Sequence, residues 1–476
     1  MTETALWYLT IREAGALLRS GELSPVELTR VFLERIDRLD GRLQAYITVL
    51  PEAAMAAARV AEAEMLRGHY KGPLHGIPIA LKDLYDTKGI KTTASSRVIA
   101  QRVPSADATT TTRLAAAGTI LLGKLAMHEF ALGGPDPTCG FPLARNPWNL
   151  EHIPGGSSSG SGTAVAAGLC MGSLGSCTGG SIRGPAAYCS MVGLKPTYGR
   201  VSRYGVVPLS WSLDRCGPMT WTVEDTALML QAIAGFDPQD PSTSQAPVPD
   251  YQAALKADIK GLRIGVIKEA VEADFLQPQV KATVMQAITD LSTLGATIVE
   301  VSIPILPSAA AVTRAILAVE SATLHHDWIR TRLRDYDHNV QIDFLTGAIL
   351  PAQLYYKAQQ LRELTRQQVF AALQQADVLA LPGSSEPAPL LPTRPGIQSK
   401  EEARQRMAGR RSFTGVFNLA NVPALCVPCG FVGVDGKNLP IGLQLAAKPF
   451  ADGLLLKVAH AYEQSTTWHT RRPPMA

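Results

Sequence analysis

The sequence predicts an α/β fold in which a mixed β-sheet core is flanked by α-helices. Strand and helix patterns alternate along most of the chain, which is the arrangement expected of a sheet covered by helices. Hydrophobic residues make up 46% of the 476 residues, enough for a large core. Because no internal repeat is visible, we expect one domain over residues 1–476. We expect it to contain a helical part at about 1–70, a core at about 73–235 and an inserted, mostly helical section at about 305–400.

The N-terminal part carries two helix patterns. Ser24–Glu27 (SPVE) has the form of a capping box with proline at the first helical position. Apolar residues then recur at helical spacing: Val26, Leu28, Val31, Phe32, Ile36 and Leu39. The Ala- and Glu-rich segment 51–66 predicts a second helix.

The remaining elements follow in order. We expect strands at 75–83, 119–122, 262–267, 296–301, 424–427 and 441–445. We expect helices at 108–117, 279–294, across most of 308–376, and at 453–464. Two proline-rich stretches, 236–260 and 383–400, predict irregular loops.

Composition excludes several classes of function. With 45 basic and 41 acidic residues and no long run of one sign, the chain predicts neither a nucleic-acid partner nor a membrane surface. No secretory signal and no apolar stretch of about 18 residues is visible. The seven cysteines are odd in number and scattered, which favours reduced thiols and a cytoplasmic location.

The segment Gly155–Gly184 holds most of the chemical information. It has ten glycines and seven serines in 30 residues, with no acidic residue and a single basic one, Arg183. Glycine-rich backbone exposes consecutive N–H groups to a ligand. Hydroxyl groups among such N–H groups indicate nucleophilic catalysis with an oxyanion hole.

An alternative interpretation of this segment stays open. Gly156–Gly160 fits the GxSxG elbow, which would make Ser158 the nucleophile, with Asp377 and His460 as candidate partners. An elbow follows a strand, however, and residues 149–154 (NLEHIP) are a poor strand.

Four other motifs have unremarkable explanations. Gly118–Lys124 fits GxxxxGK but lacks the following Ser or Thr, and Gly160–Gly162 begins a GxGxxG without a strand before it. We therefore expect no phosphate or dinucleotide site. His325-His326-Asp327 lies in a helical pattern where adjacent side chains diverge by about 100°. Cys426-Val-Pro-Cys429 has no second cysteine pair, so we expect no metal site.

The chain resembles the amidase signature family in several motifs. They are HGIPIALKDLYDTKGIKTTASS around Lys82, GKLAMHEFALG at 123–133, GGSSSGSGTAVAAG at 155–168 and TGGSIRGPAAYCSMVGLKPTYGRVSRYGVVP at 178–208. The resemblance implies a mixed sheet flanked by helices, no cofactor and no metal. It implies that Ser181 is the nucleophile, Lys82 the catalytic lysine, and Ser157 a serine after a cis peptide bond with Gly156.

The chemistry of these residue types agrees with those roles. A serine hydroxyl needs a base, and a lysine acts as one only when burial keeps it neutral. Ser157 would relay the proton between Ser181 and Lys82. We expect the oxyanion donors to be the backbone N–H groups of Thr178, Gly179, Gly180 and Ser181. The resemblance also assigns substrate contacts to Met127, Gly156 and Ser158.

Two positions depart from the family pattern. Cys177 stands where the family commonly has aspartate, and Ser159 where it often has glycine. Because Cys177 lies just before the turn, we expect a buried small residue rather than a second nucleophile.

The composition of the section 305–400 is the basis for predicting the class of substrate. Its apolar stretches AAAVTRAILAVE and QIDFLTGAILPAQLYY predict a pocket for a bulky, weakly polar amide. We therefore expect a stand-alone amidase, monomeric or homodimeric. It would act on small-molecule aryl or alkyl amides, with esters and carbamates as further candidate substrates, through an acyl-enzyme on Ser181. The alternative is a glutamine-hydrolysing subunit of an amidotransferase complex. A non-catalytic scaffold is the third hypothesis.

Overall fold

An eleven-stranded mixed β-sheet forms the centre of the fold, with the strand order β1-β3-β2-β4-β6-β5-β10-β11-β9-β7-β8. The computed structural model describes residues 3–394, 396, 399–402 and 412–474. The strands are β1 Tyr46–Val49, β2 Pro78–Lys82, β3 Ile120–Leu125, β4 Gly172–Ser176, β5 Val192–Lys195, β6 Cys216–Thr220, β7 Arg263–Ile267, β8 Thr297–Val301, β9 Val378–Pro382, β10 Ala424–Val434 and β11 Lys437–Ala447.

The sheet contains both strand orientations. Strand β2 runs parallel to β3 and β4, and β7 runs parallel to β8 and β9. Between these two parallel groups, each strand pairs antiparallel with its neighbour, in the order β4, β6, β5, β10, β11 and β9. The predicted class, a mixed sheet flanked by helices, is confirmed.

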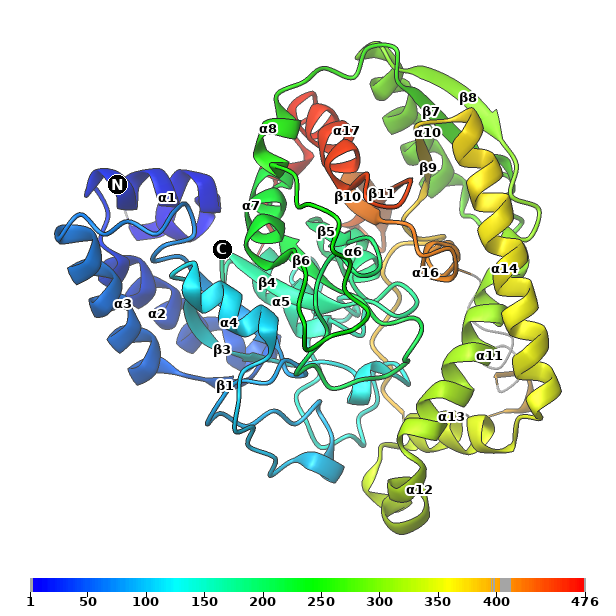
Figure 1. Cartoon of the computed structure of the whole chain (residues 1–476), viewed down its shortest axis with the longest axis horizontal. Helices are drawn as coiled ribbons and strands as arrows, with labels where there is room; N and C mark the ends of the chain where they lie inside the picture. Colours follow the sequence, from blue (N-terminus) through cyan, green and yellow to red (C-terminus); the bar gives the residue numbers. More distant parts are fainter. Residues whose placement is uncertain (1–2, 395, 397–398, 403–411, 475–476) are drawn as a thin grey trace.

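Helices surround this sheet, and Figure 1 shows the N-terminal ones on the opposite side of the molecule from α11–α14. The longer helices are α1 Ile11–Ser20, α2 Pro25–Leu43, α3 Pro51–Leu66, α4 Thr109–Ala116, α5 Ser159–Ala166, α7 Val223–Ile233, α10 Pro278–Thr293, α11 Leu306–Leu324, α13 His338–Ile349, α14 Ala352–Gln375 and α17 Asp452–Gln464. The shorter ones are α6 Arg183–Cys189, α8 Tyr251–Leu255, α9 Lys268–Val271, α12 His326–Arg332 and α16 Val416–Leu419.

The predicted start of α2 is confirmed with a change in its capping. The Ser24 hydroxyl accepts hydrogen bonds from the backbone N–H groups of Val26 and Glu27, which satisfies two donors of the first turn. Instead of completing a capping box with Glu27, Ser24 donates to Glu62 of α3 at 2.5 Å. The cap therefore also joins the two N-terminal helices.

Two predicted boundaries differ from the structure. The proline-rich stretch 236–260 contains the short helix α8, capped by Asp250. The C-terminal strands β10 and β11 extend into a hairpin that is longer than predicted. A register shift between Pro428 and Gly430 accommodates the proline in β10, because a bulge lets a strand continue past a residue that has no backbone N–H to donate.

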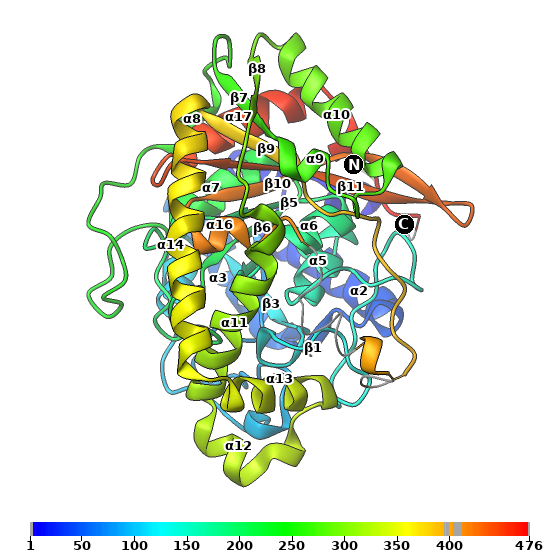
Figure 2. The same cartoon turned by 90° about the vertical axis from the view of Figure 1, so that its right-hand side faces the viewer.

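Helices α11–α14 take up most of residues 306–375, after which the chain returns to the sheet as β9. Figure 2 shows α11, α13 and α14 together on the side that faces the viewer. Helix α11 packs against α13 and α14. Within the described residues, no helix is long and apolar enough to cross a membrane.

Candidate active site

Lys82 is the last residue of β2, and its side chain is completely buried. Its Nζ lies 2.8 Å from the Ser157 hydroxyl, 2.8 Å from the Ser176 hydroxyl and 3.1 Å from the Ser158 hydroxyl. None of these partners is a carboxylate. Burial lowers the pKa of Lys82 to about 7, although Cys177, Asp214 and Cys216 oppose the shift. A large fraction of this amine is therefore neutral at neutral pH.

Ser157 follows a cis peptide bond with Gly156, as the resemblance implies. Its carbonyl accepts a hydrogen bond of 3.1 Å from the backbone N–H of His128. A Cβ atom at Gly156 would lie 1.9 Å from the His128 ring, so only glycine fits there. Met127, the residue before His128, is buried, and its backbone N–H donates to Ser95.

Ser181 lies beside this segment on the turn before α6. Its carbonyl accepts a hydrogen bond of 3.3 Å from the backbone N–H of Ser158. Ser181 is half-buried, whereas Lys82 and Ser157 are buried. Of the three predicted catalytic side chains, Ser181 is thus the one open to a substrate.

The turn 178–181 presents unused backbone donors. In the part of the chain that the structure describes, none of its four N–H groups donates a hydrogen bond to another protein group. Gly180 has a φ of 145°, and a Cβ atom there would lie 2.3 Å from the Thr414 hydroxyl oxygen. Free donors on a turn of this kind can bind a developing negative charge on a substrate oxygen.

Two side chains hold this turn in place. The Thr178 hydroxyl donates to Asp214 at 2.6 Å, and the Thr414 hydroxyl donates to the Gly179 carbonyl at 2.6 Å. Asp214 also accepts hydrogen bonds from the backbone of Leu209 and Ser210. These contacts fix the backbone orientation before any substrate arrives.

Cys177 lies directly before the turn and contacts the buried guanidinium of Arg183. Arg183 Nη2 is 3.5 Å from the Cys177 sulfur, and the other partners of this guanidinium are neutral groups of Thr414, Asn418 and Gln444. Burial alone raises the pKa of the Cys177 thiol, but the charge and hydrogen bond of Arg183, with smaller contributions from Lys195 and the Ile182 backbone, together make the net shift downward. Arg183 therefore favours a thiolate where the family commonly has aspartate.

Three residues of this site were missed from the sequence: Ser176, Asp214 and Thr414. Ser176 ends β4, and a serine at the end of a buried strand directly before the Cys177 turn was an available signal. Asp214 and Thr414 lie far from the turn in sequence, and no local pattern marks them.

The alternative motifs do not form sites. No strand precedes Gly156, and the Ser158 hydroxyl is buried against Lys82 and the Ser176 carbonyl, which argues against an elbow. Lys124 is a buried strand residue paired with Asp83 at 3.2 Å.

The His325 side chain and the Cys426 and Cys429 side chains are buried. Burial lowers the pKa of His325 to about 3, and its ring packs on Phe130, Tyr336 and Phe344. Among the described residues, no cluster of His, Cys, Asp and Glu side chains has a metal-binding arrangement.

A buried lysine bonded to a serine, beside a glycine-rich turn with free N–H groups, is typical of enzymes that transfer acyl groups through serine. The comparison with known families is specific: the Amidase family model matches residues 27–456. The chain belongs to this amidase (amidase signature) family and is a hydrolase of carboxamide C–N bonds.

Relatives and solved structures extend the likeness over nearly the whole chain. Two curated relatives are named as A subunits of glutamyl-tRNA(Gln) amidotransferase. The protein of Moorella thermoacetica is 42% identical and that of Chloroflexus aggregans 43% identical, each over 99% of both chains. A solved structure described as an unexpected vestigial protein complex that reveals the origins of an s-triazine catabolic enzyme is 33% identical. It has a TM-score of 0.88 and covers 96% of this chain and 98% of its own.

These comparisons contradict the expected stand-alone amidase for aryl or alkyl amides. They also contradict the expected partners, a small-molecule amide bound by a monomer or homodimer. Both expectations are wrong, because full-length relatives are named as subunits of an amidotransferase.

The structure gives the physical reason for the error. The apolar stretch 341–356 faces outward in part, since Leu345, Ile349 and Tyr356 are exposed at the surface, Ile349 to 81%. The buried residues of α11 pack into the core instead.

Proposed function

We propose that this chain is the glutamine-hydrolysing subunit of an amidotransferase and that it works within a complex. The observation that carries the proposal is the likeness to the A subunits of amidotransferases over 99% of both chains. The contacts of Lys82 with Ser157 and Ser176 support the chemistry that this role requires.

In the proposed reaction, Ser181 Oγ attacks the carboxamide carbon of glutamine. Its proton passes through the Ser157 hydroxyl to neutral Lys82, and the substrate oxygen gains negative charge facing the N–H groups of 178–181. When the C–N bond breaks, the proton returns through Ser157 to the nitrogen, which leaves as ammonia. Water then cleaves the acyl-enzyme by the same route and releases glutamate. In this proposal the substrate contacts are assigned to Met127, Gly156 and Ser158.

The proposal places the complex in the cytoplasm. It is supported by the seven cysteines, none of which forms a disulfide among the described residues. It also takes residues 1–476 as a single amidase domain, supported by the one continuous sheet.

The test is ammonia release from glutamine, measured for the chain alone and with the companion amidotransferase subunits from the same genome. We expect slow hydrolysis alone, acceleration in the complex, and loss of both in Ser181→Ala. Glutamine hydrolysis that is unaffected by companions, or absent with all of them bound, contradicts the proposal.

A further inference from the structure

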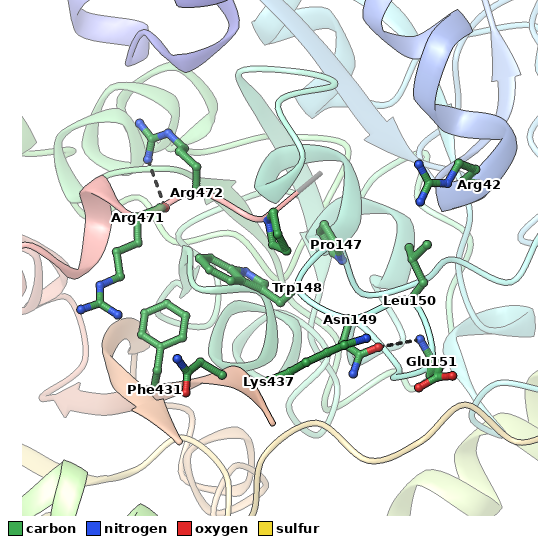
Figure 3. A pocket seen from close by; sticks show the side chains of 12 residues that line it. Arg42, Pro147, Trp148, Asn149, Leu150, Glu151, Phe431, Lys437, Arg471 and Arg472 are labelled. Carbon is green, nitrogen blue, oxygen red and sulfur yellow. Dashed lines mark hydrogen bonds between the residues drawn. The ribbon is translucent and has the colours of Figure 1, made fainter. Parts of the chain in front are cut away.

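A groove of about 880 Å³ lies apart from the active site, between the segment 147–151, the β10–β11 hairpin and the C-terminal segment. Figure 3 shows Trp148 near its centre, Phe431 and Arg471 on one side, and Arg42 of α2 on the other. Lys82, Ser157 and Ser181 are not among its lining residues. We call this feature the basic groove.

The basic groove concentrates positive charge. Its charged lining consists of one carboxylate, Glu151, and four cations: Arg42, Lys437, Arg471 and Arg472. The net charge of the whole chain is only +4. Arg42, Lys437 and Arg471 are exposed and form no ion pair within the described residues. Such a concentration attracts an anionic partner.

The position of the cations indicates the form of that partner. Arg42, Lys437 and Arg471 come from three separate segments, and Figure 3 shows Arg42 and Arg471 at opposite sides of the groove. A single small anion would meet only part of this set. An extended chain with several carboxylates can reach all three, since arginine and lysine bind carboxylates through charge-assisted hydrogen bonds.

The aromatic residues argue against nucleic acid. Single-stranded nucleic acid binds by stacking its bases on free aromatic faces. Trp148 is only 8% exposed, and its indole N–H donates to the Cys189 carbonyl. Phe431 has the Trp148 ring at 4.7 Å and the Arg471 guanidinium at 5.0 Å. The Phe431 ring is therefore already packed against protein groups and is not a free face for a base.

We propose that the basic groove binds an acidic segment of a companion polypeptide. This inference rests on the proposed function, because it assigns a docking surface to the complex in which the chain works. Within such a complex, carboxylates of that segment pair with Arg42, Lys437 and Arg471, and its backbone lies along the wall formed by 147–151.

The basic groove is also connected to the active site. The wall 147–151 lies a few residues before Gly156 and Ser157, and the Asn146 side-chain amide donates to the carbonyls of Ile153 and Tyr188. Tyr188 belongs to α6, which begins just after Ser181. A segment bound against this wall restrains both the Ser157 and the Ser181 segments, which gives a physical reason for faster hydrolysis in the complex.

The first experiment measures fluorescence anisotropy of a labelled twelve-residue peptide with six glutamates, at low and at physiological salt. The test variant is Arg42→Glu/Lys437→Glu/Arg471→Glu. The matched control is Arg59→Glu/Arg67→Glu/Lys281→Glu, which makes the same charge change at exposed residues outside the groove. We expect the test variant to weaken binding about tenfold or more and the control about twofold or less, because paired charges act at short range. Circular dichroism checks that both variants are folded.

Other results would overturn the inference. They are absent peptide binding, equal weakening in both variants, or tighter binding of a twelve-nucleotide RNA that the test variant loses. Co-purification with the companion subunits, expected to fall in the test variant alone, gives the second readout. Glutamine hydrolysis by the unmodified complex separates the two proposals. If it fails while groove-dependent peptide binding holds, the proposed function is wrong and the docking surface stands.

Discussion

The Nζ atom of Lys82 lies 2.8 Å from the Oγ atom of Ser157, and both side chains are buried. The lysine belongs to β2 and the serine to the segment before α5, so the sheet and the glycine-rich loop meet at this contact. Three hydroxyl groups surround the amine without supplying a negative charge. This arrangement favours a neutral lysine that exchanges a proton with Ser157.

The first prediction concerns pH. Because the base is the neutral amine and the pKa of Lys82 is about 7, kcat/KM should rise as pH increases through about 7 and level off above it. The measurement is the pH profile of glutamine hydrolysis by the complex. Lys82→Ala should lower kcat/KM by about 10²–10⁴-fold and remove this ionisation. An acid optimum in the unmodified enzyme would contradict the assignment of the base.

The second prediction separates the two candidate nucleophiles. Ser181→Ala should lower kcat by at least about 10³-fold, because no acyl-enzyme can form. Ser158→Ala should retain much more activity, since it removes only one of three hydroxyl contacts to Lys82. Peptide mapping after treatment with a fluorophosphonate should find the adduct on Ser181, and an adduct on Ser158 would favour the elbow.

The third prediction tests the oxyanion turn. Gly180→Ala should lower kcat by about 10²-fold, because the new Cβ meets the Thr414 hydroxyl and the residue has a φ of 145°. Gly41→Ala is the matched control in α2, where nothing lies within 4 Å of the added atom. The control should keep full activity and gain roughly 0.5–1 kcal/mol of stability in thermal unfolding. Equal activity of the two variants would remove the turn from the mechanism.

The fourth prediction concerns Cys177 and Arg183. The folded-state pKa of this thiol lies below its unfolded value, so thiolate formation stabilises the fold as pH rises. The loss of unfolding free energy in Cys177→Ser should therefore grow as pH rises towards the ordinary thiol pKa of about 8.5, and should disappear as pH falls through the folded pKa. Urea unfolding across this range makes the measurement.

Two further variants serve as controls for that effect. Cys177→Asp keeps a negative charge beside Arg183 and should retain stability better than Cys177→Ser. Burial raises the pKa of Cys170 to about 12, so this thiol stays protonated over the same pH range. The loss of unfolding free energy in Cys170→Ser should therefore not change with pH. A pH-independent cost for Cys177→Ser would show that the thiol stays protonated.

Local sequence was sufficient for much of the fold. The spacing of apolar residues in 26–39 and the proline at position 25 predict α2, because both depend only on neighbours in the chain. The motifs also pointed to Lys82 and Ser157, which the structure places in hydrogen-bond contact, and to Ser181, whose carbonyl accepts from the Ser158 N–H.

Only the tertiary structure decided which distant groups complete the site and which faces are covered. Asp214 and Thr414 reach the turn 178–181, and Asn418 and Gln444 reach Arg183, through long-range packing that no local pattern encodes. The apolar residues Leu345 and Ile349 show the same limit, because periodicity reveals an apolar face but not what lies against it. By itself the sequence determined the family motifs and many of the local elements. The tertiary structure decided the burial of Lys82, the supports of the turn 178–181 and which charged side chains stay exposed, since burial and charge depend on the whole fold.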